Sequence, residues 1–315
     1  MSASLVMGEV LSRKKQGEDY YSLTVVAPAV AESVAPGQFV NVRPVGRTAH
    51  ILRRPFSVYR VHKQGGWAST FEIIFDIRGP GTEELAALDV HDKLDVMGPL
   101  GNGFRLPKKH SRCLLVGGGI GAAPLFFLAA RLREAGHRID VVLGARTSEL
   151  LLNAMDARRL ASICRITTED GSAGDTGVVT DVLGPTIERC GSEVVYTCGP
   201  HAMLEAVAGV CGAAKLPVQV AVEELMACGF GVCMSCVIPL RVRRKKGGSG
   251  SGGVLYARSC TEGPVFDGSQ VIWSDHIAAP DTIDLASELV PPPAAPPRAQ
   301  HVPAGAGAEH SPPGN

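Results

Sequence analysis

The sequence has no excess of charge of either sign. Its 31 Lys and Arg residues are balanced by 31 Asp and Glu residues. A broad basic field is what draws a protein to nucleic acid or to an anionic membrane, and the balanced charge argues against both. We therefore expect no nucleic-acid partner and no membrane partner.

An uninterrupted apolar stretch of transmembrane length is also lacking. The run from Cys113 to Ala130 carries no charge and approaches the ~20 residues that a membrane helix needs. Its glycines at 117–119 and 121, together with Pro124, would interrupt a helix in its first third. The run instead predicts a buried strand, a glycine turn and a buried helix.

The start of the chain has neither a basic segment nor a long apolar segment, so we expect no signal peptide. The cysteines number nine, whereas a disulfide framework uses an even number. Four of the nine also share one motif, described next. This usage indicates a reducing compartment, and we expect a cytoplasmic protein.

The motif around which the chain is organised consists of Cys228, Cys233, Cys236 and Cys260. The first three follow the spacing C-x4-C-x2-C, and the fourth comes after a longer gap. Four thiolates in this pattern suit a [2Fe–2S] cluster. Gly229 and Gly231 allow the tight backbone that a loop around a cluster requires.

Two other interpretations of these cysteines stay open. A structural zinc site usually has two C-x2-C pairs, whereas only Cys233 and Cys236 form one here. The four residues could also be reduced, buried cysteines without a function.

The first third of the chain alternates short apolar segments with Gly and Pro turns. We expect strands at 21–26, 38–42, 55–59, 70–75 and 93–97. Several short strands with little helix predict an antiparallel β-barrel or sandwich. A short helix is expected from Glu83 to Leu88.

Three stretches of this region stand out: 53–57 with two arginines, and the glycine-rich turns 78–82 and 98–104. Backbone N–H groups at the turn 78–82 and at the helix after it can hold a phosphate. Taken alone, a glycine-rich turn is usually only a turn, and an arginine pair is usually a solvated surface.

Taken together and in order, the stretches resemble the ferredoxin–NADP reductase superfamily. In that superfamily an R-x-x-S segment lies along a flavin, with the arginine on the phosphates and the serine near the ring. Here it corresponds to Arg54, Pro55, Phe56 and Ser57. A G-x-G-T segment holds the pyrophosphate, and here it corresponds to Gly79, Gly81 and Thr82. The resemblance implies FAD in an antiparallel barrel.

Between residues 108 and 222 the pattern changes to alternating strands and helices. Such alternation predicts a doubly wound parallel sheet with helices on both faces. Ligands of these sheets bind beyond the carboxyl ends of the strands. Three glycine-containing turns are expected there: 117–121, 171–177 and 199–200. The first of them lacks the G-x-G-x-x-G pattern and by itself is weak evidence for a dinucleotide.

The same superfamily accounts for two of these turns. Gly117, Gly118, Gly119 and Gly121 are similar to its nicotinamide-dinucleotide loop. Cys198, Gly199 and Pro200 resemble the segment whose cysteine faces the nicotinamide, which implies a catalytic role for Cys198. Cys198 could otherwise be a small buried residue at a strand end.

Glu169 and Asp170 follow an expected strand. A carboxylate there would accept from a ribose hydroxyl and repel the extra phosphate of NADP, so the pair favours NAD. An ordinary acidic turn explains the same residues equally well.

The remaining chain contains a basic segment at 241–246, a Gly/Ser run at 247–253 and a Pro/Ala-rich tail from about residue 291. We expect a solvated hairpin with a flexible loop, and a disordered tail. The predicted domains are a FAD-binding barrel at 1–107, an NAD-binding α/β domain at 108–222 and a cluster lobe at 223–275. The tail takes residues 276–315.

The order of barrel, dinucleotide domain and cluster lobe resembles one branch of the superfamily, the electron-transfer subunits of class B, NAD-dependent dihydroorotate dehydrogenases. Residues 223–236 and 260–267 carry this resemblance, which covers about residues 5 to 275. It implies electron transfer from an FMN-containing dihydroorotate dehydrogenase partner, in a heterotetramer, through the cluster and FAD to NAD. The longer gap before Cys260 and the tail depart from the pattern.

Two alternatives remain. One is the small subunit of an NADH-dependent ferredoxin:NADP oxidoreductase or of a sulfhydrogenase-type reductase. The other is a redox-sensing iron–sulfur protein without turnover, against which the flavin and nicotinamide motifs argue.

Overall fold

The computed structural model describes residues 3–17, 20–46, 51–64, 67–242 and 253–273. Most of the predicted Gly/Ser loop and the predicted tail therefore lie outside the described residues. Residues Met1–His276 form one compact unit, so the barrel, the α/β domain and the predicted cluster lobe, called the cluster segment from here on (described residues 223–242 and 253–273), pack against one another. The boundaries at 107 and 222 stay predictions.

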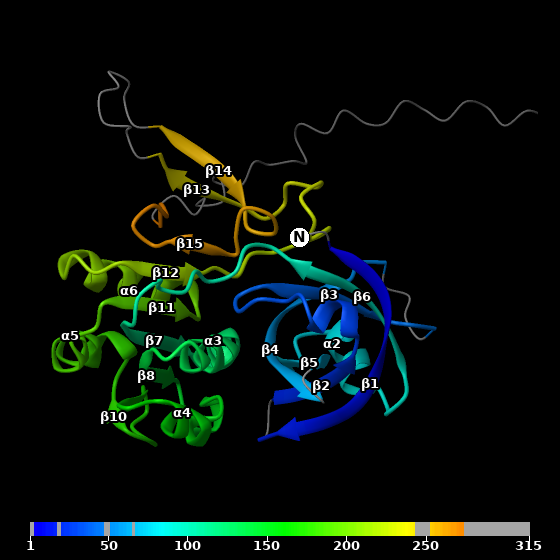
Figure 1. The fold of residues 1–315 in the computed structure, drawn as a ribbon, viewed down its shortest axis with the longest axis horizontal. Helices are drawn as coiled ribbons and strands as arrows, with labels where there is room; N and C mark the ends of the chain where they lie inside the picture. The colour runs from blue at the N-terminus through cyan, green and yellow to red at the C-terminus, as the bar shows by residue number, and fades with distance from the viewer. Residues whose placement is uncertain (1–2, 18–19, 47–50, 65–66, 243–252, 274–315) are drawn as a thin grey trace, which may run out of the picture. The chain divides into compact units, whose positions relative to one another are not determined.

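The first part of the chain forms a closed six-stranded barrel (Figure 1), in the order β1-β2-β5-β4-β3-β6. Its strands are β1 Ser4–Gln16, β2 Tyr20–Val26, β3 Phe39–Pro44, β4 Arg54–Gln64, β5 Trp67–Asp76 and β6 Lys93–Leu100, with the short helices α1 Pro28–Ala31 and α2 Pro80–Ala86. Every neighbouring pair is antiparallel. The predicted antiparallel barrel is confirmed, and α2 begins three residues before the expected helix.

The second part forms a seven-stranded sheet in the order β10-β9-β8-β7-β11-β12-β15. Its strands are β7 Arg112–Gly118, β8 Arg138–Ala145, β9 Cys164–Thr168, β10 Asp175–Thr176, β11 Val194–Cys198, β12 Val218–Ala221 and β15 Val265–Asp267. The helical segments are η1 Gly119–Ala122, α3 Ala123–Glu134, η2 Ser148–Leu150, α4 Ala154–Leu160, α5 Val179–Cys190 and α6 His201–Ala213.

Helices cover both faces of this sheet, because alternate residues of each buried strand point to opposite faces. On β7, Leu115 packs with α3 and α4 in one core cluster. Leu114 and Val116 pack with α5 and α6 in another. The predicted doubly wound arrangement is confirmed. The uncharged run from Cys113 to Ala130 forms a strand, a glycine turn and a helix, as predicted. No helix within the described ranges is long and apolar enough to cross a bilayer.

The sheet is parallel except at one edge. β15, which follows the fourth motif cysteine, pairs antiparallel with β12, with Asp267 opposite Gln219. Sequence reasoning placed this segment in the cluster lobe and ended the sheet at 222, so the edge strand is a correction. The lobe also contains the antiparallel hairpin of β13 Val237–Arg241 and β14 Val254–Arg258, which confirms the predicted hairpin.

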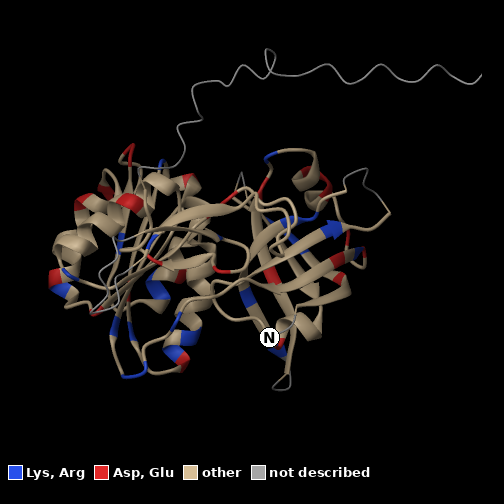
Figure 2. Cartoon of the chain, turned by 90° about the horizontal axis from the view of Figure 1, so that it is seen from above, with Lys and Arg blue, Asp and Glu red and all other residues tan. Residues whose placement is uncertain are grey.

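Polar contacts join the barrel to the α/β domain. The Tyr20 hydroxyl donates to the carbonyl of Leu150 at 2.9 Å. The Asn153 amide donates to the Tyr59 hydroxyl at 2.6 Å. Acidic and basic residues are both distributed over the two parts (Figure 2), as expected from the balanced composition.

Candidate functional site

A cavity of about 960 Å³ opens at the carboxyl ends of the parallel strands. The predicted glycine turns line it through Gly118, Gly119, Gly121, Gly177, Gly199 and Pro200. The barrel contributes Tyr20, Tyr21, Asp76, Ile77 and Arg78. The cavity therefore joins the barrel to the strand ends where a dinucleotide would bind.

Close backbone packing explains why these turns contain glycine. A Cβ on Gly121 would lie 2.6 Å from the Cα of Gly199, and one on Gly118 would lie 2.6 Å from the Met203 sulfur. The two turns thus touch, although they are distant in sequence. Gly117 does not line the cavity; a Cβ there would lie 2.6 Å from the Cβ of Ala122, so this glycine lets η1 pack on β7.

Cys198 ends β11, opposite Gly117 of β7 in the sheet register. Its side chain is half-buried, and it borders the cavity through Gly199 rather than lining it. Burial, followed by the charge of Glu223, raises the pKa of the Cys198 thiol to about 12. A raised pKa favours the protonated thiol at neutral pH, so the site supports a contact or steric role for Cys198 rather than that of a thiolate nucleophile.

The structure separates the two predicted acidic residues. Glu169 lines the cavity. Asp170 accepts from the hydroxyl of Ser172 at 2.6 Å and from its backbone N–H at 3.0 Å, and these bonds lower the pKa of Asp170. Asp170 therefore shapes the turn, which leaves Glu169 as the carboxylate that can meet a ligand.

Two further lining residues were missed by the sequence reasoning. Arg146 follows β8 and lines the cavity, as does Glu169 after the neighbouring parallel strand β9. Thr167 lines it with a hydroxyl that is buried and makes no hydrogen bond within the described part of the chain. Such a hydroxyl at a strand end suits a ligand polar group. The signal in the sequence that could have identified Thr167 is its position two residues before Glu169.

The two predicted flavin segments lie against each other. The guanidinium of Arg54 sits over Gly81, where an added Cβ would lie 2.7 Å from its Nε. Arg54 also donates to the carbonyl of Leu52 at 2.8 Å. Its neighbour Arg53 instead pairs with Asp95 at 2.7 Å. The strand alternation explains why only one arginine of the pair reaches the glycine turn.

The other flavin-segment residues are held by the barrel. Pro55 lies opposite Asn41 and Ser57 opposite Phe39 in the β3–β4 register. The ring of Phe56 packs against Phe75, with 5.4 Å between centroids. The side chains of residues 54–57 are all partly exposed. This strand start therefore offers surface that a bound molecule could cover.

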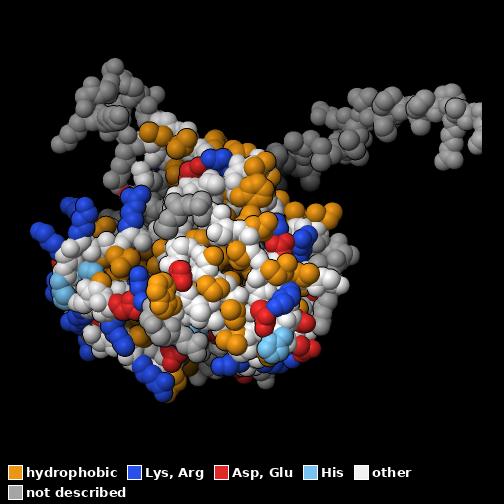
Figure 3. All heavy atoms as spheres, turned by 45° about the vertical axis from the view of Figure 1, so that its right-hand side comes forward, with side chains coloured by type: hydrophobic (Ala, Val, Ile, Leu, Met, Phe, Trp, Pro, Cys, Tyr) orange, Lys and Arg blue, Asp and Glu red, His pale blue; other side chains and the backbone are white. Residues whose placement is uncertain are grey.

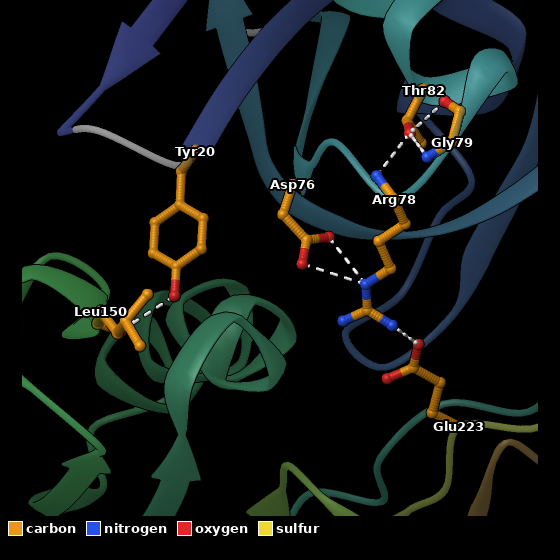
Figure 4. A network of polar contacts seen from close by, with 7 residues as sticks. All are labelled: Tyr20, Asp76, Arg78, Gly79, Thr82, Leu150 and Glu223. Carbon is orange, nitrogen blue, oxygen red and sulfur yellow. Dashed lines mark hydrogen bonds and ion pairs between the residues drawn. The ribbon is translucent and has the colours of Figure 1, made fainter.

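Thr82 holds the turn that precedes α2. Its hydroxyl accepts from the backbone N–H of Arg78 at 2.8 Å and of Gly79 at 3.2 Å (Figure 4), and donates to the Gly79 carbonyl at 3.0 Å. These bonds make Thr82 a residue that shapes the turn. Gly79 itself is extended, so positive φ does not explain it.

Arg78 connects the barrel to the start of the cluster segment (Figure 4). Its Nε lies 3.0 Å from both carboxylate oxygens of Asp76, and its Nη1 lies 3.4 Å from Glu223. All three side chains line the cavity. This ion-pair network joins the barrel to the start of the cluster segment at the cavity wall. The sequence alone gave no sign of these ion pairs.

In the cluster loop, residues 228–236, backbone N–H groups point at the sulfur atoms of Cys228 and Cys233. Val232 and Cys233 donate to the Cys228 sulfur at 3.3 and 3.4 Å, and Cys228 donates to the Cys233 sulfur at 3.5 Å. Hydrogen bonds from Ser235, then from the Cys228 backbone, lower the pKa of Cys233 to about 6. Donors of this kind stabilise thiolates, the form that binds metal.

The other two motif cysteines are buried and form a second pair. Burial, followed by the Cys236 thiol, raises the pKa of Cys260 to about 12. The two share a small core cluster with Phe39 and Leu100 of the barrel. Among the described residues, no three His, Cys, Asp or Glu side chains are arranged to hold one metal ion. The four cysteines thus stand as two pairs, Cys228 with Cys233 and Cys236 with Cys260.

The predicted role of the loop glycines is supported by geometry. Gly229 has φ +75° and Gly231 has φ +90°, where other residues are strained. The Gly231 carbonyl accepts from Arg258 at 2.8 Å, and Arg258 is itself paired with Glu262. The fourth-cysteine segment thereby fixes the loop that carries the first three.

Two asparagines of the barrel region hold the cluster segment. Asn41 donates to the Cys228 carbonyl at 3.1 Å. Asn102 donates to the carbonyls of Thr261 at 2.9 Å and Glu262 at 3.1 Å. Sequence reasoning missed both, because their partners are remote in sequence.

Two protein families match parts of the chain. Residues 223–272 match the iron-sulfur cluster binding domain of dihydroorotate dehydrogenase B. Residues 115–209 match the oxidoreductase NAD-binding domain. These matches cover the cluster motif and all three glycine-containing turns described above.

Curated relatives match most of the chain. The electron transfer subunit of dihydroorotate dehydrogenase B (NAD(+)) from Desulforamulus reducens is 35% identical over 80% of this chain and 92% of its own length. The protein of the same description from Geobacillus kaustophilus is 38% identical over 84% of this chain and 96% of its own length.

Solved structures share the fold. The structure of an NADH-dependent reduced ferredoxin-NADP oxidoreductase, described in connection with flavin-based electron bifurcation, has a TM-score of 0.71 and 30% identity, over 85% of this chain and 91% of that one. A ferredoxin NADP+ reductase from Neisseria gonorrhoeae with bound FAD and NADP has a TM-score of 0.55 at 15% identity, over 66% of this chain and 91% of that one, which shows the fold alone.

Proposed function

This chain belongs to the family of dihydroorotate dehydrogenase B (NAD(+)) electron transfer subunits, oxidoreductase subunits of pyrimidine biosynthesis, and we propose that it works with FAD, a [2Fe–2S] cluster and NAD. The observation that carries the proposal is the order of three sites in one compact unit. The cluster segment packs on barrel strand β3, β3 pairs with the flavin segment of β4, and the cavity joins the barrel to the dinucleotide turns.

For NAD, the glycine turns 117–121 and 199–200 would admit the dinucleotide backbone, and Glu169 would accept from a ribose hydroxyl. The Thr167 hydroxyl is a second polar group without a protein partner in the described chain. Cys198, protonated and half-buried, would border the nicotinamide.

For FAD, Arg54 and Gly81 would hold the phosphates. A cation lies there directly over Gly81 in the first turn of α2, which lets a phosphate reach both charge and backbone. Pro55, Phe56 and Ser57 would lie along the flavin, supported by the partial exposure of this strand start. Gly79 and Thr82 set the shape of the turn.

For the cluster, two pairs of cysteines suit two irons, each with two thiolate ligands. The N–H donors aimed at the Cys228 and Cys233 sulfurs support this donor set. When bound, the flavin exchanges one or two electrons and the cluster exchanges one, so together they connect hydride chemistry with single-electron transfer.

The proposed partner is an FMN-containing subunit that oxidises dihydroorotate, in a heterotetramer with this chain. The curated relatives are electron transfer subunits of dihydroorotate dehydrogenase B, which supports a partner of this kind. All nine cysteines are free, which supports a reducing, cytoplasmic compartment.

The test is to purify the chain anaerobically and to assay iron, acid-labile sulfide, FAD and NADH-dependent dye reduction. We expect two irons, two sulfides and one FAD per chain, with dye reduction by NADH. Zinc without sulfide would overturn the cluster assignment. Loaded protein without dye reduction would favour the redox-sensing alternative.

A second candidate is the small subunit of an NADH-dependent reduced ferredoxin–NADP oxidoreductase. The 30% identity and TM-score of 0.71 to such a structure favour it. Co-purification separates the two: a partner that reduces its flavin with dihydroorotate supports the first, whereas a partner that exchanges electrons with ferredoxin supports the second.

A further inference from the structure

The outer face of β3 carries a buried amide beneath the cluster loop. Val40 and Val42 point into the barrel core. Phe39 and Asn41 alternate with them and point outward, where the cluster segment covers them. Asn41 is only 1% exposed. Burying an amide costs free energy unless the amide is hydrogen-bonded. The hydrogen-bond partner of Asn41 therefore indicates what this residue does.

Asn41 contacts the loop at the first motif cysteine. Its Nδ2 donates to the Cys228 carbonyl at 3.1 Å. A Cβ on Gly229 would lie 2.0 Å from this Nδ2, and Gly229 also has φ +75°. The loop backbone therefore rests directly on the amide, and any side chain at 229 would displace it. The amide and the glycine fit each other.

The same residue adjoins the flavin segment. Asn41 lies opposite Pro55 in the β3–β4 register, and Val42 lies opposite Arg54. Pro55 has no N–H, so β4 contributes no backbone donor at this position. The Asn41 side chain is thus a direct link from the strand beside the flavin segment to the segment that begins the cluster loop.

We propose that Asn41 is a positioning residue that fixes Cys228, and with it the cluster, relative to the flavin segment. The proposal rests on the cluster and FAD sites proposed above. Asn102 offers a natural comparison, because its amide also clamps the cluster segment but does so beside Cys260 and from outside β3. If Asn41 only docked the segment, the two residues would be equivalent.

The experiment compares Asn41→Leu, Asn41→Asp and Asn102→Leu in the full chain, loaded and purified anaerobically. Leu has similar volume but no donor. Asp keeps the shape of the side chain but replaces the N–H donor by an oxygen that faces the Cys228 carbonyl. The Asp variant also allows the test to be made if the Leu variant does not accumulate as folded protein. The readouts are iron and FAD content, the electron paramagnetic resonance spectrum of the reduced cluster, and amide hydrogen exchange of the loop 228–236.

A rapid-mixing measurement with NADH completes the experiment. NADH delivers two electrons as a hydride to the flavin, and each cluster accepts one, so the flavin and cluster absorbance changes are followed separately. We expect the flavin change to stay within twofold of wild type and the cluster change to slow about tenfold or more, as for other residues that orient metal ligands. Both Asn41 variants should shift the spectrum and speed exchange, whereas Asn102→Leu should do neither.

Equal effects of Asn41→Leu and Asn102→Leu, or an unchanged cluster rate and spectrum in both Asn41 variants, would overturn the positioning role. Loss of iron in Asn102→Leu but not in the Asn41 variants would overturn it as well. A wild-type chain without cluster or FAD is a different outcome, because it would refute the proposed function instead.

Discussion

The guanidinium of Arg54 lies over the backbone of Gly81, so close that a Cβ on that glycine would come within 2.7 Å of its Nε. The two residues come from different elements, the start of β4 and the start of α2. A cation above a glycine leaves room for an anion that contacts charge and backbone together. The contact is therefore the strongest geometric support for the proposed phosphate site.

Arg54→Ala should weaken FAD binding, since it removes a charge-assisted hydrogen bond worth about 1.5–3 kcal/mol. That range corresponds to roughly a 10- to 150-fold rise in Kd, measured by fluorescence titration of the apoprotein. Gly81→Ala should act in the same direction, because the added methyl group would push Arg54 away.

The matched control is Arg53→Ala, which removes the neighbouring charge but breaks the pair with Asp95 instead. It should lower stability with little change in FAD affinity. Unchanged FAD affinity in Arg54→Ala, or an equal loss in both variants, would show that Arg54 is only a surface residue.

Glu169→Gln should shift cofactor preference towards NADPH. The carboxylate lines the cavity and would repel a 2′-phosphate. We expect kcat/KM for NADH to fall about tenfold, the value of one charge-assisted hydrogen bond, and kcat/KM for NADPH to rise. Asp170→Asn is the control, because that carboxylate is bonded to Ser172. A wild-type chain without NADH preference would refute the argument.

Stability should decline at alkaline pH because buried thiols resist ionisation. Burial raises the pKa of Cys113 and of Cys211 to about 12, from an ordinary 9.0. A raised folded-state pKa stabilises the fold fully below pH 9, and this contribution is lost as pH rises from 9 through 12. Thermal unfolding across this range should show a falling Tm, less steep in Cys211→Ala. A flat Tm up to pH 11 would contradict it.

Cys233→Ser should lower iron and sulfide content together, because a hydroxyl is a poorer iron ligand than a thiolate. Cys164→Ser is the control, since that cysteine lies in β9, outside the motif. Iron and sulfide assays on anaerobically purified variants measure the effect. Full occupancy in Cys233→Ser would remove this residue from the ligand set.

Much of the fold was predictable because its signals are local. Alternating strands between Gly and Pro turns indicated the barrel, and an apolar strand followed by glycines indicated β7 and its turn. The C-x4-C-x2-C spacing of the first three motif cysteines indicated the cluster loop for the same reason. In each case the residues that determine the structure are neighbours in sequence.

What sequence reasoning missed depends on pairing across the chain. Nothing local marks Val265–Asp267 as an edge strand of the dinucleotide sheet, since its three residues need β12 as a partner. Glu169 lines the cavity whereas Asp170 is hydrogen-bonded to Ser172, and both contacts depend on the folded turn. Asn41 becomes meaningful only once Cys228 lies above it.

The cluster loop presents apolar side chains to the surface. Phe230 is 50%, Val232 is 71% and Met234 is 50% exposed. Hydrophobic side chains are also visible in the upper part of the face drawn in Figure 3, the region of the cluster segment in Figure 1. Such exposure shows that these residues do not close the loop off from water, and it favours a contact with a partner.

We therefore predict that the chain alone does not oxidise dihydroorotate. The residues that the structure describes, 3–17, 20–46, 51–64, 67–242 and 253–273, belong to the barrel, the α/β domain and the cluster segment, so an FMN site for that oxidation is expected on a partner. Assays of the loaded chain with dihydroorotate and NAD should show no turnover. Addition of the candidate partner should make turnover appear. Val232→Asp should weaken that complex, since it places a charge in the apolar contact, while NADH–dye reduction stays unchanged. Turnover without any partner would refute the prediction, and failure of an intact, loaded chain to bind the partner would favour the ferredoxin-linked alternative.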